Sequence, residues 1–137
     1  MPGDHNVGAV VPMLCVSDME RSLRYYIEGL RFEMKNKWVV EGKIRWCSLA
    51  LGDAAIMLQQ FGKVPEGKLG AGMSLWFQGK DAIAIYHEVT SRGIVASEPQ
   101  VGNGLWETSL SDPDGYRLNF VSPTDVPEET KLSELSA

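Results

Sequence analysis

The chain has 137 residues, of which 44% are hydrophobic and 23% are charged, and its formal net charge is -5. This size fits one domain or two small joined modules with a packed core. The acidic balance and the scattered Lys and Arg argue against a nucleic-acid or anionic-membrane surface, since both need a basic patch. No stretch resembles a signal peptide or approaches the roughly 20 apolar residues of a membrane span. We therefore expect a cytoplasmic protein.

The first half of the chain carries patterns for a strand, a helix and three further strands. A short apolar run at residues 10–16 has strand character, and either Ser17 or Asp18 can cap the helix that follows. The apolar residues of that helix recur at helical spacing and are Met19, Leu23, Tyr26 and Leu30. Three strands are expected at residues 32–40, 44–51 and 54–59, separated by turn signals at 41–42 and 52–53.

The second half repeats this order after a linker at residues 62–72, which holds four glycines and one proline. A strand at 73–78 leads through Asp81 into a helix that ends at Gly93. The remaining strands are expected at 94–97, 106–111 and 117–121, with a flexible loop at 101–104 and a turn at 112–115.

An internal repeat links the two halves. The apolar triplets that begin at Ile56 and Leu118 occupy the last strands, and the helix-opening residues are Asp18 and Asp81. Similar units at such a spacing bury their apolar faces jointly. We therefore predict an α+β fold of two tandem βαβββ modules. The predicted parts are an N-terminal arm at 1–9, modules at 10–61 and 73–122, the linker at 62–72 and a polar tail at 123–137.

Two stretches of the sequence carry a family resemblance. They read VSDMERSLRYYIEGLRFEM at residues 16–34 and LSDPDGYRLNFVSP at residues 110–123. With the repeat, they resemble the vicinal oxygen chelate superfamily, which includes glyoxalase I, bleomycin-resistance proteins and extradiol dioxygenases. The resemblance covers residues 10–122 and implies two modules whose mixed sheets curl into a cup, usually within a homodimer.

Most enzymes of this superfamily hold a divalent metal with His, Glu or Gln from the first and last strand of each module. The repeat places these positions at Val11, Met57, Ser74 (or Met73) and Asn119. None of these side chains supplies an imidazole or a carboxylate, so they do not form a tight site for a divalent cation. His5 lies in the arm and His87 in the second helix, away from the cup. We therefore expect no metal and no other cofactor.

The candidate ligand-binding residues are aromatic, sulfur-containing or polar side chains on strands. Tryptophan offers a flat surface and one donor, which suits aromatic or cationic ligands, although a strand-borne tryptophan is as often a core residue. Strand alternation turns Met13, Met57 and Asn119 inward. The full candidate set is Trp46, Trp76, Trp106, Met57, Asn119, Met13, Trp38 and Arg117. Arg45 or Arg117 would suit an anion, and Glu107 would suit a cation.

The resemblance implies a small-molecule-binding protein closest in character to a metal-free bleomycin-resistance protein. It would act as a homodimer and sequester an aromatic, amphipathic or cationic drug or metabolite, as in antibiotic resistance. The alternative is a lyase, isomerase or dioxygenase with an atypical metal site built from His5 or a partner chain, so enzyme activity stays open. A third possibility is an interaction module whose cup is filled by Trp38, Trp76 and Met57.

Overall fold

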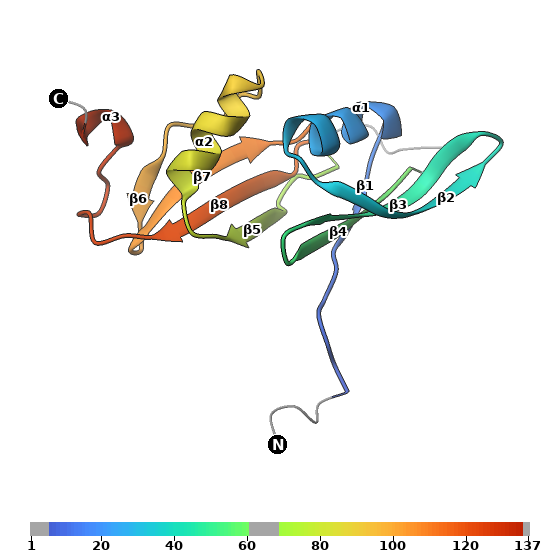
Figure 1. The fold of residues 1–137 in the computed structure, drawn as a ribbon, viewed down its shortest axis with the longest axis horizontal. Helices are drawn as coiled ribbons and strands as arrows, with labels where there is room; N and C mark the ends of the chain where they lie inside the picture. Colours follow the sequence, from blue (N-terminus) through green and yellow to red (C-terminus); the bar gives the residue numbers. More distant parts are fainter. Residues whose placement is uncertain (1–5, 61–68, 136–137) are drawn as a thin grey trace.

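The structure is a computed structural model, and it describes residues 6–60 and 69–135. These residues form two four-stranded sheets, with strand orders β1-β4-β3-β2 and β5-β8-β7-β6 (Figure 1). In each sheet the first and last strands of a module pair in parallel, and the other strands pair antiparallel. This arrangement confirms the α+β fold of the glyoxalase/bleomycin-resistance kind. No helix in the described ranges is long and apolar enough to cross a membrane.

The first module follows the predicted order closely. Its elements are β1 (Met13–Cys15), α1 (Met19–Leu23), a π-helical turn (Arg24–Gly29), β2 (Glu33–Val40), β3 (Lys43–Leu51) and β4 (Ala54–Gln59). Helix α1 begins where the Asp18 carboxylate accepts a hydrogen bond from the Arg21 N–H at 3.2 Å. The strand predicted at residues 10–16 is shortened at its start, where Val10 and Val11 stay exposed. In Figure 1 the segment before β1 runs away from the sheets on the side opposite to α1.

The second module differs from the prediction in one segment. Its elements are β5 (Ser74–Gln78), α2 (Ala82–Ser91), β6 (Gln100–Gly102), β7 (Leu105–Ser111), β8 (Arg117–Pro123) and a final short helix α3 (Leu132–Leu135). The strand predicted at residues 94–97 is wrong, because β6 begins six residues later. Only Ser97 bonds to β7 there, and Pro99 has no N–H for a ladder. The loop predicted at 101–104 is instead β6 followed by an Asn103-Gly104 hairpin turn with positive φ at both residues.

The main core lies between the sheets and the helices and crosses from one module to the other. Figure 1 shows α1 and α2 on the same side of the two sheets. Beneath them Phe32 of the first module meets Phe77 of the second, with ring centroids 6.0 Å apart, and Phe77 stacks on Phe120 at 4.7 Å. Leu58 and Leu118, at equivalent places in β4 and β8, are fully buried in this core. The two modules therefore share one packed interior.

A buried hydrogen-bond network joins the turn at residues 112–115 to the first module. The Asp112 carboxylate accepts bonds from the Tyr26 hydroxyl at 2.6 Å and from the backbone N–H groups of Asp114 and Tyr116 at 2.8 and 2.9 Å. The Tyr116 hydroxyl donates to the Cys15 carbonyl at 2.9 Å. The turn that the sequence predicts therefore also fixes β1 and the first helical segment to β8.

Candidate functional site

Each sheet has one face packed against a helix and one face that no helix of the described ranges covers (Figure 1). We call the second face the open face. In β8 the Ser122 hydroxyl accepts from the Ala82 N–H of α2 at 2.8 Å, so even-numbered residues of this strand face the helix. Side chains alternate along a strand, and directly paired residues share a face. The strand registers therefore define both open faces.

The middle of the first sheet's open face carries aromatic, sulfur-containing and uncharged polar side chains. Two cross-strand rows form it, namely Met13, Met57, Ser48 and Asn36, and then Cys15, Gln59, Trp46 and Trp38. Trp38 is 56% exposed and Met13 is 44% exposed, whereas Trp46 is half-buried. Ser48 and Ala50 are small, so they leave room beside the Trp46 ring. These rows therefore combine the exposed rings and thioethers with the polar side chains of Asn36, Ser48 and Gln59.

The open face of the second sheet is more polar. Its rows are Ser74, Arg117 and Ser111, then Trp76, Asn119 and Ser109, and then Gln78, Val121, Glu107 and Gln100. Trp76 is 53% exposed, and its indole N–H donates to the Ser74 hydroxyl at 3.1 Å. Asn119 is only 3% exposed, and its Oδ1 accepts from the Ser109 hydroxyl at 2.6 Å. The Trp76 indole is therefore oriented by Ser74, and Asn119, its partner in the neighbouring strand, is a polar group fixed by Ser109.

A cavity of about 450 Å³ lies at the β6 side of this second open face. Its lining is mostly polar and consists of Ser97, Glu98, Gln100, Val101, Gly102, Glu107, Ser109 and Arg117. A smaller cavity of about 220 Å³ shares Ser97, Ser109 and Arg117 with it. The second sheet therefore places charged groups of both signs beside the strand that carries Asn119.

Trp106, one of the predicted site residues, lies on the helix side of the second sheet. It is 6% exposed and packs with Ala82 and Val101. It pairs with Ser122, whose hydroxyl contacts α2, so its ring lies on the face opposite to Trp76. The segment before Trp106, predicted as a flexible loop at 101–104, ends in a tight hairpin turn at Asn103-Gly104. Residues Val126 and Leu132 of the tail pack against the same cluster.

The structure brings the remaining candidates onto the two open faces in two groups. Trp38, Trp46, Met13 and Met57 lie on the first sheet, while Trp76, Asn119 and Arg117 lie on the second. Sequence reasoning missed Ser109 as the partner of Asn119. Its signal was available, because Trp106, Thr108 and Leu110 are the buried alternates of β7 and Ser109 lies between them.

The four positions at which the internal repeat predicts the superfamily's metal ligands carry poorly coordinating side chains. Val11 and Met57 belong to the first module, and Ser74 and Asn119 to the second. Among residues 6–60 and 69–135, no three His, Cys, Asp or Glu side chains gather as a metal site. His87 is exposed on α2, and His5 lies outside the described residues. Because the four side chains provide no imidazole and no charged oxygen, they do not fit a catalytic divalent metal.

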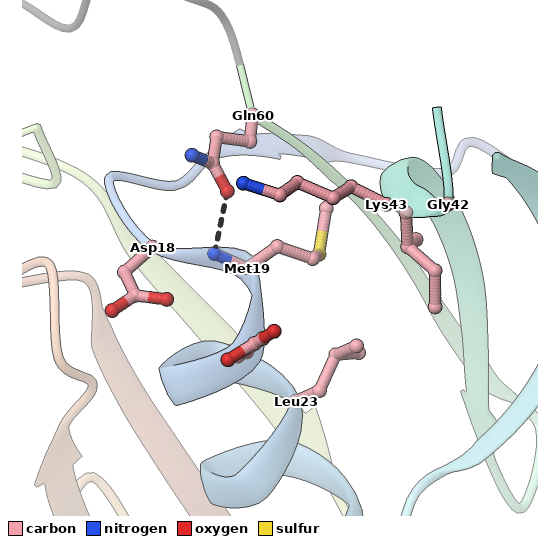
Figure 2. Close-up of a pocket in the computed structure, with 8 residues that line it drawn as sticks. Asp18, Met19, Leu23, Gly42, Lys43 and Gln60 are labelled. Carbon is pink, nitrogen blue, oxygen red and sulfur yellow. Dashed lines mark hydrogen bonds between the residues drawn. The ribbon is translucent and has the colours of Figure 1, made fainter. Parts of the chain in front are cut away.

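A separate cavity of about 330 Å³ lies on the helix side, between the start of α1 and the turn that joins β2 to β3. Figure 2 shows Leu23 and Lys43 at its wall, with the Gln60 side-chain oxygen accepting from the Met19 N–H at 2.7 Å. Asp18, Glu20, Gly42 and Ile44 complete the lining. No aromatic ring is among these residues, so this cavity suits a flat aromatic molecule less well than the open faces do.

The fold defines a class of paired βαβββ proteins in which each sheet has one face without a helix. The model of the Glyoxalase/Bleomycin resistance protein/Dioxygenase superfamily matches residues 7–120, so the chain belongs to this superfamily. The search of curated proteins gave no match.

Several solved structures share the fold at about one-fifth sequence identity. The bleomycin resistance determinant encoded on the transposon Tn5 aligns with a TM-score of 0.71 and 20% identity, over 88% of this chain and 100% of that chain. TnmS3, an antibiotic binding protein from Streptomyces sp. CB03234, aligns with a TM-score of 0.70 and 21% identity, over 88% and 99%. A bleomycin-binding protein complexed with bleomycin aligns with a TM-score of 0.69 and 21% identity, over 85% and 98%.

Proposed function

We propose that this protein binds an aromatic or amphipathic small molecule on its open faces, without a metal, and so sequesters it. The observation that carries this proposal is the exposure of Trp38 and Trp76 on sheet faces that α1 and α2 leave uncovered. A ligand that removes about 100 Å² of one such ring from water gains about 2.5 kcal/mol at roughly 25 cal/mol per Å². Two of the similar structures are an antibiotic binding protein and a bleomycin-binding protein in complex with bleomycin, which supports the same class of ligand here.

We propose further that the chain acts as a homodimer that covers its open faces in part. Val7, Val10, Val11 and Met13 are all exposed, and they make an apolar strip along the segment that leads into β1 and at its first residue. Such strips on small proteins usually mark an interaction surface. Both cysteines are free thiols, which fits the reducing cytoplasm as the site of action.

The dimer predicts a mass near 2 × 15.1 = 30.2 kDa. Sedimentation velocity measures this directly for the full chain at several protein concentrations. We expect a single species near that mass, and Val10→Asp should shift it toward the 15.1 kDa monomer because a charge enters an apolar contact. Val95→Asp, at an equally exposed valine in the loop before β6, is the control and should leave the mass unchanged. A monomer at every concentration contradicts the dimer.

Tryptophan fluorescence tests ligand binding. A panel of bleomycin, flat aromatic cations and neutral aromatic compounds should include at least one that quenches or shifts the emission saturably. Trp38→Ala or Trp76→Ala should lower the affinity for that ligand by about tenfold or more, since aromatic side chains contribute most of the binding energy in such contacts. Trp106→Phe is the matched control, because this residue lies on the helix side, and it should leave the affinity unchanged. If no compound alters the emission, the binding function fails.

Elemental analysis of protein purified without chelators separates binding from metal-dependent catalysis. We expect far less than one divalent ion per chain, because the four superfamily positions hold no charged ligand. A stoichiometric ion that resists dialysis would instead favour a lyase, isomerase or dioxygenase with an atypical site.

A further inference from the structure

Glu107 stands out among the side chains of the second open face. It lies in the middle of β7, is half-buried, and pairs with Val121 on one side and Gln100 on the other. No hydrogen bond or ion pair to its carboxylate occurs within residues 6–60 and 69–135. If a ligand covers this surface, the Glu107 carboxylate loses water without gaining a hydrogen-bond donor. This loss costs binding free energy unless the ligand brings a cation to the carboxylate.

The position of the Glu107 carboxylate depends on Gly102. A side chain at residue 102 would overlap Glu107 Oε2, so the absence of a Cβ there lets the carboxylate lie over β6. Both residues line the cavity of about 450 Å³. The φ of Gly102 lies outside the left-handed region, so backbone conformation does not require a glycine at this place. The space it leaves is occupied by the carboxylate.

The surroundings of Glu107 favour a cation over an anion. Glu98 lines the same cavity and adds a second carboxylate, although this one already accepts from the Ser133 N–H at 2.9 Å. Arg117 is the one cation in that lining, but it is exposed, and its long side chain can keep its charge in water. The chain as a whole carries a net charge of -5, which also draws cations toward it.

Trp76 lies on the same open face, within reach of the same ligand. It pairs with Asn119 in β8, and Val121, the partner of Glu107, is the next residue of β8 on that face. Trp76 and Glu107 therefore lie two strands and two residues apart, a separation of about 12 Å at the usual strand spacing and rise. A ligand whose aromatic ring lies on Trp76 and whose positive group lies at that distance can contact the indole and also pair with the Glu107 carboxylate.

We propose that Glu107 is the specificity-determining residue of the ligand site and selects planar aromatic cations over their neutral counterparts. This inference rests on the proposed binding function and assigns the charge of its ligand. Glu107 accepts the positive group in the cavity beside β6, Trp76 contacts the ring system, and Gly102 holds the space in which the carboxylate lies.

Two flat probes of similar shape test the inference by tryptophan fluorescence at pH 7.5. Proflavine is a cation at this pH, and acridine is neutral. The wild-type protein should bind proflavine more tightly than acridine. Glu107→Gln should weaken proflavine by about tenfold, the usual effect of a lost charge-assisted hydrogen bond, and should leave acridine unchanged. Gly102→Ala should also reduce the preference for proflavine over acridine. The added methyl group displaces the Glu107 carboxylate, although Glu107 keeps its charge.

Glu98→Gln is the comparison variant in the same cavity, and it should reduce the proflavine preference much less than Glu107→Gln, because the Glu98 carboxylate already accepts from the Ser133 N–H at 2.9 Å. Equal loss in Glu98→Gln and Glu107→Gln would overturn the role of Glu107, since overall charge would then explain the effect. If wild type and Glu107→Gln bind both probes equally, the inference fails while the proposed binding function stands. If the wild-type protein binds neither these probes nor any member of the wider panel, both fail together.

Discussion

Gly70→Ala should lower the free energy of unfolding by about 3 kcal/mol, at the upper end of the usual cost of forcing extra atoms into a packed site. Gly70 is buried, and its N–H donates to the Asp114 carbonyl at 3.1 Å. A Cβ at this position would overlap backbone atoms of Gly115 and Tyr116, which cannot move aside as a flexible side chain can. Urea unfolding followed by tryptophan fluorescence measures the change.

Gly72→Ala is the control for this prediction. Gly72 has a φ of 78°, and a Cβ there would meet nothing within 4 Å, so the substitution adds only local backbone strain of about 1 kcal/mol. The two glycines lie two residues apart in the same segment before β5. A Gly70→Ala protein as stable as the Gly72→Ala protein would contradict the close approach between this segment and the turn at residues 112–115.

Asp112→Ala should also lower the free energy of unfolding by about 3 kcal/mol, because it leaves buried donors without an acceptor. These donors are the Tyr26 hydroxyl and the N–H groups of Asp114 and Tyr116. The loss would loosen the junction of the two modules as well as the turn. Asp53→Ala, in the exposed turn between β3 and β4, should change stability by less than about 0.5 kcal/mol. Similar unfolding midpoints for the two variants would contradict this prediction.

Asp112 also predicts a pH dependence of stability. Burial raises the pKa of its carboxyl above the usual value, and hydrogen bonds from Tyr26, Tyr116 and Asp114 offset only part of that rise. A folded-state pKa above the unfolded one means that folding favours the protonated form. The contribution of the protonated Asp112 carboxyl to the free energy of unfolding is therefore fully present below the usual Asp pKa of about 4. It is lost as the pH rises through the pKa of Asp112 in the folded protein.

Asp112→Asn tests this dependence, because the amide stays neutral and keeps hydrogen-bonding capacity. The free energy of unfolding of the wild-type protein should decline more between pH 4 and pH 7 than that of Asp112→Asn. Urea unfolding at four or five pH values in this range gives the two curves. Parallel curves would show that Asp112 does not contribute to the pH dependence.

Much of the fold was predictable because its signals are local. Asp18 and Asp81 cap α1 and α2 as the sequence indicates, since a carboxylate that accepts from the N-terminal N–H groups of a helix depends only on neighbouring residues. The alternation around Leu118 and Phe120 places both side chains in the core. The repeat of these signals after 63 residues for the helix caps and 62 for the last strands then predicts paired modules.

The candidate site was harder to predict because it depends on which strands lie side by side. Trp38 and Trp46 share one open face only because β2 and β3 pair at that register. Trp106 has a strand pattern like theirs, yet it packs under α2 because Ser122, its partner in β8, faces that helix. The sequence therefore predicts that a tryptophan lies on a strand, whereas the pairing of the strands decides whether its ring lies in the core or on the open face.

The sequence by itself determined the order of strands and helices, the two-module architecture and the absence of His, Glu or Gln at Val11, Met57, Ser74 and Asn119. These features follow from short-range periodicity, capping residues and residue identity at repeated positions. Only the tertiary structure decided that the backbone of Gly70 packs closely against the backbone of Gly115 and Tyr116. It also decided that Gly102 leaves space for the Glu107 carboxylate. Both are contacts between segments that the sequence separates or places on different strands, and their distances exist only after the sheets have formed.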